Sequence, residues 1–214
     1  AITGITGLLG KYLVANAPSN VEIIGVSKTR PARNLPLGAQ HVTLDMASTR
    51  LSYALRKYAP DAVIHAAAEG RVDAVQGRMD EHRALNVEPA LDLAHFCAEQ
   101  NSPFILISSN AVFGGVKAVY DDSDPPDPVN DYGRLKAEAE AMVRDVYPTA
   151  TILRPILMYG WPFPGARLNP VVSWIESLRN QAPISVVSDI GTEPLAAWDC
   201  AKVVWRSLEG GLTG

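Results

Sequence analysis

Short apolar runs rich in valine and isoleucine recur along the chain, and helix-like stretches separate them. The runs predict strands at 21–26, 41–44, 62–66, 104–107 and 151–153. Strands that alternate with helices form βαβ units, in which the strands are parallel and the crossovers are right-handed. The pattern therefore predicts an α/β fold built on a doubly wound parallel sheet.

The stretches between these runs predict helices at 11–17, 50–58, 86–100 and 132–147, with a further helix at 171–179. Residues 110–131 are rich in Asp, Pro and Gly, and they include Asp124-Pro125-Pro126-Asp127-Pro128, which no regular helix accommodates. We expect a long loop here, and long loops inside compact domains are often functional. Trp198 and Trp205 are seven residues apart in another helix-like stretch, a spacing that predicts one buried face.

Composition narrows the class of protein. A chain of 214 residues with 47% hydrophobic content can bury one substantial core and leaves room only for a small appendage. The net charge of -4 and the lack of a long basic run give no support to a nucleic-acid partner. The apolar stretches are too short for a membrane span, and no secretory signal is present, so we expect a cytoplasmic protein.

Neither the cysteines nor the histidines suggest a metal or a disulfide framework. Cys97 and Cys200 are far apart and outside any Cys-x-x-Cys spacing, so both are expected to be buried thiols. The four histidines lack a helical metal spacing, and His65 fits packing in the core or beside a cofactor better than metal ligation. We expect no structural metal.

Three glycines, Gly4, Gly7 and Gly10, stand between a short apolar start and the first predicted helix. Only Ala1-Ile2 precede the turn, whereas a buried strand needs about five residues, so we expect the true N-terminus to lie further upstream. Glycines allow a tight turn and close backbone approach to a pyrophosphate at a helix N-terminus. The spacing differs from Gly-x-Gly-x-x-Gly, so a plain strand-to-helix turn stays open as the alternative.

The end of the second predicted strand bears on which dinucleotide would bind. Ser27, Lys28 and Arg30 follow it, and cationic residues there suit a ribose 2′-phosphate, which favours NADP over NAD. The alternative is a solvated surface loop. Asp45, at the end of the next strand, could accept a hydrogen bond from adenine or cap the turn at Met46.

Tyr132 and Lys136 are four residues apart at the start of a predicted helix, on one face of it. A nearby ammonium is expected to lower the pKa of a tyrosine so that it can transfer protons near neutrality. The spacing alone is weak, because Tyr53 and Lys57 share it. Position discriminates between them, since only Tyr132 follows a strand that ends in a polar pair.

That polar pair is Ser108-Ser109, directly after the strand at 104–107. In a parallel sheet the carboxyl ends of strands face the ligand crevice, so a hydroxyl here could hydrogen-bond a substrate carbonyl and share its proton with Tyr132. The alternative is ordinary capping at the entry to a loop.

Taken in order, the glycine turn, Ser108-Ser109 and Tyr132 to Lys136 resemble the extended short-chain dehydrogenase/reductase superfamily, whose nucleotide-binding domain is of the Rossmann type. Ser108 to Gly114, Asp131 to Glu138 and Leu153-Arg154-Pro155 look like its dTDP-4-dehydrorhamnose reductase branch. The branch commonly has Thr at the position of Ser109 and an aromatic-polar pair at Glu69-Gly70. These departures concern the substrate rather than the fold.

The resemblance implies a catalytic triad of Ser109, Tyr132 and Lys136, with Lys136 also holding the nicotinamide ribose. It places Asn86 in the helix after the alanines, where its alternative is an exposed polar residue. It also implies an NAD(P)-binding domain at 1–154 and a partial substrate-binding region at 155–214, interleaved with the core. Motifs and resemblance together assign the cofactor to Gly4, Thr6, Gly7, Leu8, Leu9, Gly10, Ser27, Lys28, Arg30, Asp45, Met46, Ala66, Ala67, Ala68, Tyr132 and Lys136.

The function that this resemblance implies is NAD(P)H-dependent reduction of a nucleotide-activated 4-keto sugar, with Tyr132 as proton donor. NADP(H) is the favoured cofactor and NAD(H) the alternative. Two other functions stay open, a nucleotide-sugar epimerase or dehydratase with the same triad, and a non-catalytic NADP-binding regulatory subunit like that of methionine adenosyltransferase. The expected partner is a small-molecule nucleotide sugar, with neither nucleic acid nor membrane, and a homodimer is left open.

Overall fold

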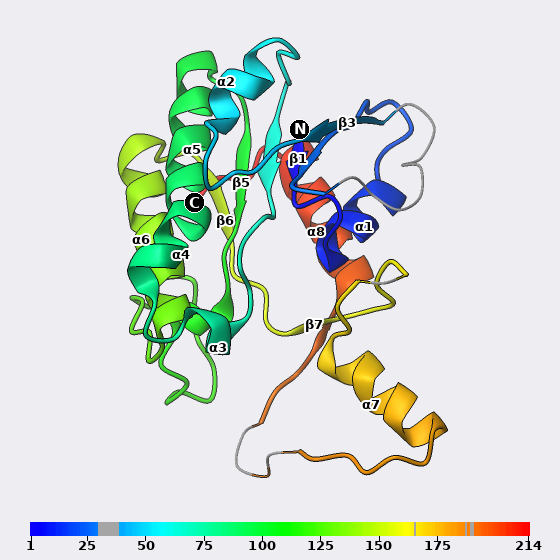
Figure 1. Cartoon of the computed structure of the whole chain (residues 1–214). Helices are drawn as coiled ribbons and strands as arrows, with labels where there is room; N and C mark the ends of the chain where they lie inside the picture. The colour runs from blue at the N-terminus through cyan, green and yellow to red at the C-terminus, as the bar shows by residue number, and fades with distance from the viewer. Residues whose placement is uncertain (30–38, 165, 187, 189–190) are drawn as a thin grey trace.

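A six-stranded parallel sheet with the order β3-β2-β1-β4-β5-β6 lies at the centre of the molecule (Figure 1). The computed structural model describes residues 1–29, 39–164, 166–186, 188 and 191–214. The strands are β1 (Ile2–Thr3), β2 (Ile24–Ser27), β3 (Gln40–Thr43), β4 (Val63–His65), β5 (Phe104–Ile107) and β6 (Thr151–Leu153). The order reverses between β1 and β4, which confirms the predicted doubly wound, Rossmann-like α/β fold.

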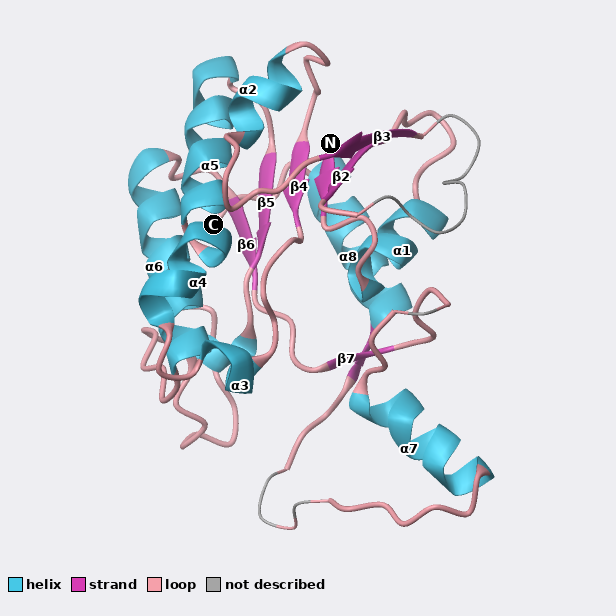
Figure 2. Ribbon diagram, viewed as in Figure 1, coloured by secondary structure: helices cyan, strands magenta, loops and turns pink. Residues whose placement is uncertain are grey.

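Helices cover both faces of this sheet (Figure 2). The helices are α1 (Leu8–Ala15), α2 (Leu51–Arg56), α3 (Val72–Val75), α4 (Met79–Asn86), α5 (Glu88–Gln100), the 3-10 turn η1 (Asn110–Val112), α6 (Asp131–Val146), α7 (Pro170–Arg179) and α8 (Ala197–Glu209). The pair α1 and α8 packs on one face, and α2, α4, α5 and α6 pack together on the other. The result is a three-layer arrangement.

The apolar runs follow from this layering, because successive side chains of a strand point to opposite faces. Phe104 and Leu106 of β5 join the core beneath α5 and α6. Ile105 and Ile107, the alternate residues of the same strand, join the core beneath α1 and α8. All four are buried, so a strand covered on both sides reads as a continuous apolar run.

Most of the predicted element boundaries hold within a few residues, and one helix was missed. The strands predicted at 104–107 and 151–153 are confirmed at those bounds. The helix predicted at 86–100 is observed as α5, which begins two residues later at Glu88, and the preceding helix α4, which ends at Asn86, was not predicted. Pro89 lies in the first turn of α5, where its missing N–H costs nothing, and this favours a new helix start there.

The prediction that Trp198 and Trp205 share a buried face is wrong for Trp198. Trp205 is 6% exposed and its Nε1 donates to the Leu13 carbonyl at 2.8 Å, which fixes α8 against α1. Trp198, in the first turn of α8, is 43% exposed. There it meets the edge of the Tyr12 ring, with 6.2 Å between the ring centroids, and Nζ of Lys202 lies 5.5 Å from the Trp198 centroid.

The C-terminal part of the chain adds a small sheet of its own. Its strands, β7 (Met158–Tyr159) and β8 (Leu195–Ala196), pair in parallel, and α7 extends from them away from the main sheet (Figure 2). Among the described helices, none combines the length and the apolar character that crossing a membrane requires.

Candidate functional site

The switch point of the sheet lies between β1 and β4, which are hydrogen-bonded neighbours. From there the chain winds outward in opposite directions, to β2 and β3 on one side and to β5 and β6 on the other. Loops that leave the carboxyl ends of such strands diverge, and ligands of open α/β sheets bind in the crevice between them. The predicted site residues follow the ends of β1, β2, β3, β4 and β5, so they belong to this edge.

The glycine turn after β1 is packed too closely for any side chain at two of its positions. Gly4 has a φ of +71° and a Cβ on it would lie 2.9 Å from the carbonyl of Ala66. A Cβ on Gly10 would lie 2.3 Å from the Gly4 carbonyl oxygen. The glycines therefore bring the start of α1 against the turn and against the backbone that follows β4.

The start of α1 has no side chain that caps it. Its N-cap is Gly7, whose own N–H donates to the Gly4 carbonyl at 2.8 Å. The first N–H groups of a helix carry partial positive charge and readily face an anion. Thr6 precedes this N-cap, and Leu8 and Leu9 are the first residues of the helix, so no described side chain satisfies the first N–H groups of α1.

Thr3 links the ends of β1 and β4 through its side chain. Its Oγ1 accepts from the Ala67 N–H at 3.2 Å and is hydrogen-bonded to Nδ1 of His65 at 2.7 Å. Burial, and secondarily the charge of Lys136, lowers the pKa of His65 to about 3, so its imidazole is neutral. His65 packs in the core at the end of its strand, as expected, and Ala66 to Ala68 follow beside the glycine turn.

Asn86 supports the same loop from α4. Its Oδ1 accepts from the Glu69 N–H at 2.8 Å, and the residue is 1% exposed. The alternative of an exposed polar helical residue is therefore wrong, because Asn86 turns inward to hold the backbone after the alanines. Its Nδ2 is buried without a partner, as are Oγ of Ser108 and Nε2 of His82.

The ends of β2 and β3 are joined by an ion pair. Nζ of Lys28 lies 2.8 Å from Oδ2 of Asp45, and both side chains are accessible to solvent. Lys28, with the Ala47 N–H, lowers the pKa of Asp45. Asp45 also caps the following turn, because its Oδ1 accepts from the Ala47 N–H at 3.2 Å. The predicted capping role of Asp45 is thus observed, and Met46 lies within the capped turn.

The Ser27 side chain belongs to the sheet rather than to an open loop. It is buried, and its Oγ donates to the Thr29 carbonyl and contacts Nε2 of His41, both at 2.8 Å. Arg30, the other cation predicted to favour NADP, lies outside the described residues.

Ser109 and Tyr132 meet where β5 ends and α6 begins. Ser109 is the N-cap of η1, and its Oγ accepts from the Ala111 N–H at 3.1 Å, so it does cap the loop entry. Burial raises the pKa of Tyr132, hydrogen bonding to the Ser109 hydroxyl opposes this, and the Glu69 carboxylate adds to the rise. The expectation that Lys136 lowers this pKa is wrong, because burial raises it and Lys136 is not among the groups that shift it.

Lys136 is buried and turns toward β5. It is 2% exposed, and its Nζ donates to the Ile107 carbonyl at 2.7 Å. Burial lowers its pKa to about 8, although the carboxylate of Glu140 acts in the opposite direction. The lysine therefore stands at the last residue of β5, two positions before Ser109, so Ser109, Tyr132 and Lys136 converge on one place.

Gly133 makes this convergence sterically feasible, and it was not among the predicted site residues. A Cβ on Gly133 would lie 2.1 Å from the Ala111 carbonyl oxygen, so only glycine lets α6 approach η1 this closely. Asn130 fixes the start of α6, because its Oδ1 accepts from the Gly133 N–H at 2.8 Å. The signal for Gly133 was its place directly after Tyr132.

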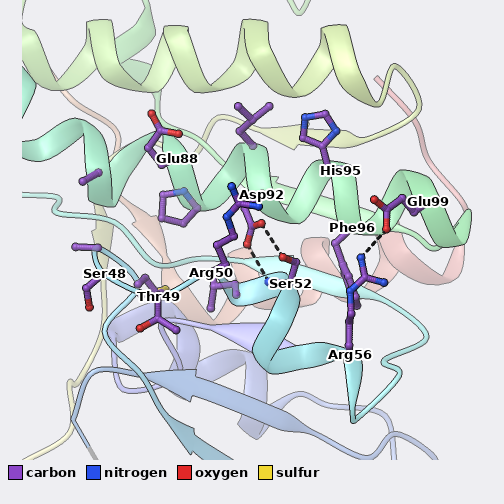
Figure 3. Close-up of a pocket in the computed structure, with 16 residues that line it drawn as sticks. Ser48, Thr49, Arg50, Ser52, Arg56, Glu88, Asp92, His95, Phe96 and Glu99 are labelled. Atoms are coloured by element: carbon purple, nitrogen blue, oxygen red, sulfur yellow. Dashed lines mark hydrogen bonds and ion pairs between the residues drawn. The ribbon is translucent and has the colours of Figure 1, made fainter.

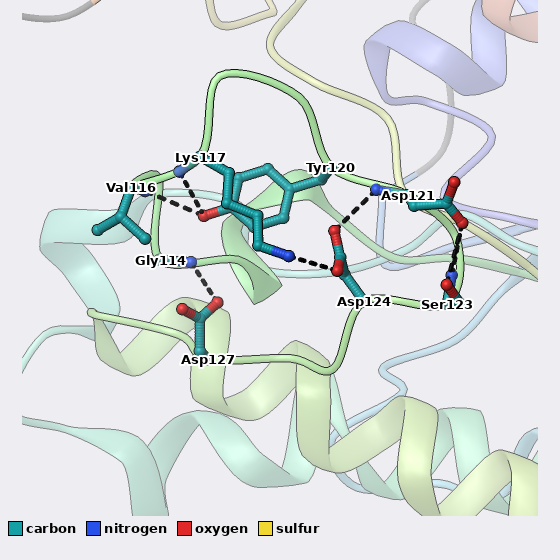
Figure 4. Close-up of polar contacts among 8 residues, drawn as sticks. All are labelled: Gly114, Val116, Lys117, Tyr120, Asp121, Ser123, Asp124 and Asp127. Carbon is teal, nitrogen blue, oxygen red and sulfur yellow. Dashed lines mark hydrogen bonds and ion pairs between the residues drawn. The ribbon is translucent and has the colours of Figure 1, made fainter.

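The predicted long loop is confirmed between η1 and α6, and its side chains organise it (Figure 4). Tyr120 accepts at its hydroxyl from the N–H groups of Val116 and Lys117, at 3.0 and 3.4 Å. Nζ of Lys117 pairs with Asp124, which also accepts from the Asp121 N–H. The segment from 113 to 127 is thus a structured loop beside the site.

Contacts from α1 reach the region after residue 155. Lys11 donates from Nζ to the Trp161 carbonyl at 2.7 Å, and the Tyr12 hydroxyl accepts from the Trp161 N–H at 2.9 Å. Gly160 packs so closely on the Tyr12 ring that a Cβ would lie 2.8 Å from it. The helix that begins at the glycine turn is therefore tied to the C-terminal region.

A cavity of 610 Å³ lies elsewhere, between α2 and α5 (Figure 3). Asp92 accepts there from the N–H and the hydroxyl of Ser52, and Arg56 pairs with Glu99 at 2.8 Å. The cavity is lined by Met46 from the predicted set, but by none of the three predicted catalytic residues.

Comparison with known proteins decides the family. The family described as RmlD substrate binding domain matches residues 1–213. The chain belongs to the RmlD family. Within it, the probable low-salt glycan biosynthesis reductase Agl14 of Haloferax volcanii is 30% identical over 217 residues, covering 100% of this chain and 71% of that protein. The dTDP-4-dehydrorhamnose reductase of Sinorhizobium fredii is 31% identical, covering 95% of this chain and 64% of that protein.

Another relative of this RmlD-family chain is named as a subunit of an enzyme rather than as a reductase. Methionine adenosyltransferase 2 subunit beta of Bos taurus is 35% identical over 160 residues, which cover 74% of this chain. The match spans only 46% of that protein, so this chain corresponds to about half of its length.

Solved structures agree on the fold. A hypothetical dTDP-4-dehydrorhamnose reductase from Sulfolobus tokodaii superimposes with a TM-score of 0.85 at 24% identity, covering 100% of this chain and 73% of that one. The Bacillus anthracis dTDP-4-dehydrorhamnose reductase, solved in complex with NADP, has a TM-score of 0.80 at 24% identity, covering 100% and 72%. MoeE5, solved with UDP-glucuronic acid and NAD, has a TM-score of 0.78 at 25% identity, covering 95% and 70%. Structural relatives thus bind either NADP or NAD.

Proposed function

We propose that this chain carries the cofactor site and the proton donor of a reductase for a nucleotide-activated 4-keto sugar. The observation that supports it best is the convergence of Ser109, Tyr132 and Lys136 at the end of β5, on the edge of the sheet that carries the glycine turn. A glycine turn alone fits many nucleotide-binding proteins, whereas a buried phenol, a hydroxyl and an ammonium beside it suit carbonyl chemistry.

The residues present fit a dinucleotide. The cradle at Gly4 and Gly10 leaves no room for a side chain, and the amide nitrogen of Asn86 and the hydroxyl of Ser108 are buried without protein partners. The residues that would hold the cofactor are Gly4, Thr6, Gly7, Leu8, Leu9, Gly10, Ser27, Lys28, Arg30, Asp45, Met46, Ala66, Ala67, Ala68, Tyr132 and Lys136. When bound, a reduced nicotinamide cofactor supplies the hydride.

The protein residues then handle the proton. Burial raises the pKa of Tyr132 above its usual value, so near neutral pH the phenol keeps its proton and is in the form that a donor needs. The Ser109 hydroxyl can hydrogen-bond the carbonyl oxygen of a substrate and orient it toward Tyr132. Lys136, as an ammonium, stabilises the phenolate that remains after proton transfer.

NADP(H) remains the favoured cofactor, although the Lys28–Asp45 ion pair at the ends of β2 and β3 competes with binding of its 2′-phosphate. Lys28 is already neutralised by Asp45 at 2.8 Å, so it can contact a ribose 2′-phosphate only by giving up part of that pair. Its side chain is 71% exposed and therefore free to move at little cost. The carboxylate of Asp45 would repel the 2′-phosphate. NAD(H), which lacks that phosphate, is therefore the alternative.

A second candidate function is an NADP-binding regulatory subunit without turnover. It is favoured by the 35% identity to methionine adenosyltransferase 2 subunit beta. The third candidate, an epimerase or dehydratase, uses the same residues and returns its cofactor unchanged. The presence of Ser109, Tyr132 and Lys136 favours an enzyme over the regulatory subunit. The small region at 155–214 is proposed to contribute part of the substrate site.

The experiment that tests this proposal follows the nicotinamide absorbance of NADPH and of NADH with and without a dTDP-4-keto-6-deoxy sugar. Oxidation that depends on the sugar is the expected result. Tight cofactor binding without oxidation, together with interconversion of the sugar, would replace the reductase with an epimerase. Tight binding without any change in the sugar would replace it with a regulatory subunit.

A further inference from the structure

The ion pair between Arg154 and Glu140 is much less exposed than the other ion pairs in the described parts of the chain. The side chains of Arg154 and Glu140 are 12% and 2% exposed. Nε of Arg154 lies 3.1 Å from both carboxylate oxygens, and Nη2 lies 2.7 Å from Oε2. Burying two charges carries a large desolvation penalty that their attraction only offsets, so such a pair contributes little net stability compared with apolar packing. Its position therefore calls for another explanation.

On one side, the pair faces the proposed proton-transfer residues. Glu140 follows Lys136 by four residues and Tyr132 by eight, so all three lie on the same side of α6. The carboxylate of Glu140 favours the charged form of Lys136, which burial disfavours. The other charged or titratable groups that act here are His65 from β4, Tyr132 from α6 and Arg154 itself.

On the other side, Arg154 stands at the end of β6 between two backbone contacts that hold the Ser109 segment. The Leu153 carbonyl accepts from the Ser108 N–H at 2.7 Å, and the Pro155 carbonyl accepts from the Asn110 N–H at 3.1 Å. These bonds lie immediately before and after Arg154. Arg154, which contacts Glu140, thus lies between the two residues whose carbonyls hold the backbone on either side of Ser109.

The guanidinium also covers the first side chain of the structured loop. Its carbon lies 4.9 Å from the centroid of the Phe113 ring, a favourable cation–π geometry. Phe113 stacks on Tyr120 with 4.4 Å between centroids, and the Tyr120 hydroxyl holds the Val116 and Lys117 N–H groups (Figure 4). A continuous set of contacts therefore runs from α6 through Arg154 to the loop.

From this arrangement we infer that Arg154 and Glu140 are positioning residues, which couple the placement of the loop at 113–127 to the Ser109, Tyr132 and Lys136 cluster. The inference rests on the proposed function for the role of that cluster. A substrate that contacts the loop would, through this pair, be aligned with the phenol of Tyr132. Neither residue touches the reacting atoms, so each acts through its neighbours.

The test uses the double variant Glu140→Gln/Arg154→Met, which removes both charges of the pair together, so that neither partner is left buried without the other. Single variants would strand one charge and could fail to fold. The matched control is Arg56→Met, because Arg56 also pairs with a glutamate, Glu99, and also lies over a phenylalanine, Phe96, at 5.8 Å from its centroid. The Arg56–Glu99 ion pair is exposed and lies between α2 and α5 (Figure 3).

Four readouts separate positioning from mere stability. Melting temperature and NADPH affinity of the double variant are expected to stay close to those of the parent. Its kcat is expected to fall at least about tenfold, and amide hydrogen exchange at Val116 and Lys117 to become faster. The control is expected to match the parent in all of these.

The outcome that overturns the inference is a double variant with parental kcat and parental exchange in the loop. A fall in kcat that merely follows a fall in melting temperature, with unchanged exchange in the loop, overturns it as well. If the parent itself shows no turnover, the proposed function fails. The exchange measurement still decides whether the pair controls the loop.

Discussion

The buried ammonium of Lys136 donates a hydrogen bond to the Ile107 carbonyl at 2.7 Å, and this contact joins α6 to the carboxyl end of β5. The carbonyl belongs to the last residue of the strand, and Ser109 follows two positions later. One hydrogen bond thus fixes the distance between the helix that carries Tyr132 and the turn that carries Ser109. The placement of the proposed proton donor depends on a lysine that is itself held out of solvent.

Burial of Lys136 predicts a pH-dependent stability with a defined sign. Its pKa is lowered from 10.5 to about 8 in the folded chain, so between these values the unfolded chain binds more protons. The free energy of unfolding therefore gains a contribution from Lys136 as the pH rises through this window, on the order of 3 kcal/mol.

The measurement is denaturant unfolding of the parent and of Lys136→Met at the two ends of that pH window. The difference between the two proteins isolates Lys136, because the buried thiols of Cys97 and Cys200 titrate in both. Parallel pH dependences of the parent and the variant would show that Lys136 is not desolvated.

Tyr132→Phe removes the phenolic proton and leaves the ring in place. We expect turnover to fall by a factor of about 10² to 10⁴, the usual contribution of a general acid, with cofactor affinity largely unchanged. Steady-state rates and NADPH binding by fluorescence titration check this. Retention of full activity would remove Tyr132 from the mechanism.

Gly10→Ala distinguishes helix propensity from crowding. Alanine in place of glycine would favour a helix by about 1 kcal/mol. Here, however, the new methyl group would lie 2.3 Å from a backbone oxygen that cannot move aside. We expect the clash to dominate, with a net loss of about 1 to 3 kcal/mol in the free energy of unfolding and loss of NADPH binding.

The control for that substitution is Gly70→Ala, since a Cβ on Gly70 would meet no atom within 4 Å. Thermal unfolding and cofactor titration of both variants provide the comparison. If Gly10→Ala bound NADPH as well as Gly70→Ala does, the turn would not be the phosphate cradle.

The Lys28–Asp45 ion pair predicts opposite effects on cofactor choice from its two members. Lys28→Met is expected to weaken NADPH binding about tenfold more than NADH binding, because a charged hydrogen-bond donor to the 2′-phosphate is lost. Asp45→Asn is expected to shift the preference toward NADPH, since it frees Lys28 and removes a competing carboxylate. Dissociation constants of NADPH and NADH, measured for both variants, test these two predictions. If Lys28→Met lost equal affinity for the two cofactors, the 2′-phosphate would bind elsewhere.

Sequence patterns predicted the sheet well because its central strands, such as β4 and β5, are buried on both faces. A short apolar run such as Phe104 to Ile107 is typical of such a strand, and its bounds were predicted correctly. The second strand was harder, because the observed strand is Ile24–Ser27 and ends in a buried serine. Ser27 can lie within the sheet since His41 and the Thr29 carbonyl satisfy its hydroxyl, and those contacts are not visible in the sequence.

The candidate site was predicted in its parts but not in its electrostatics. The spacing of Tyr132 and Lys136 placed them on one side of a helix, yet it could not show that Lys136 turns to the Ile107 carbonyl. Burial then raises the pKa of Tyr132, opposite to the expected direction. The Arg154–Glu140 pair was not predicted because it joins β6 to α6, and single-sequence spacing carries no information about such a contact.

The most direct test of the central claim is to follow deuterium from NADPH labelled at the nicotinamide hydride position into a dTDP-4-keto-6-deoxy sugar, and to analyse the product by mass spectrometry and NMR. The proposed reduction predicts one deuterium at the former carbonyl carbon, with stoichiometric consumption of NADPH by the parent protein and almost none by Tyr132→Phe. A sugar that is epimerised or recovered unchanged without deuterium, while NADPH stays bound and reduced, would contradict it.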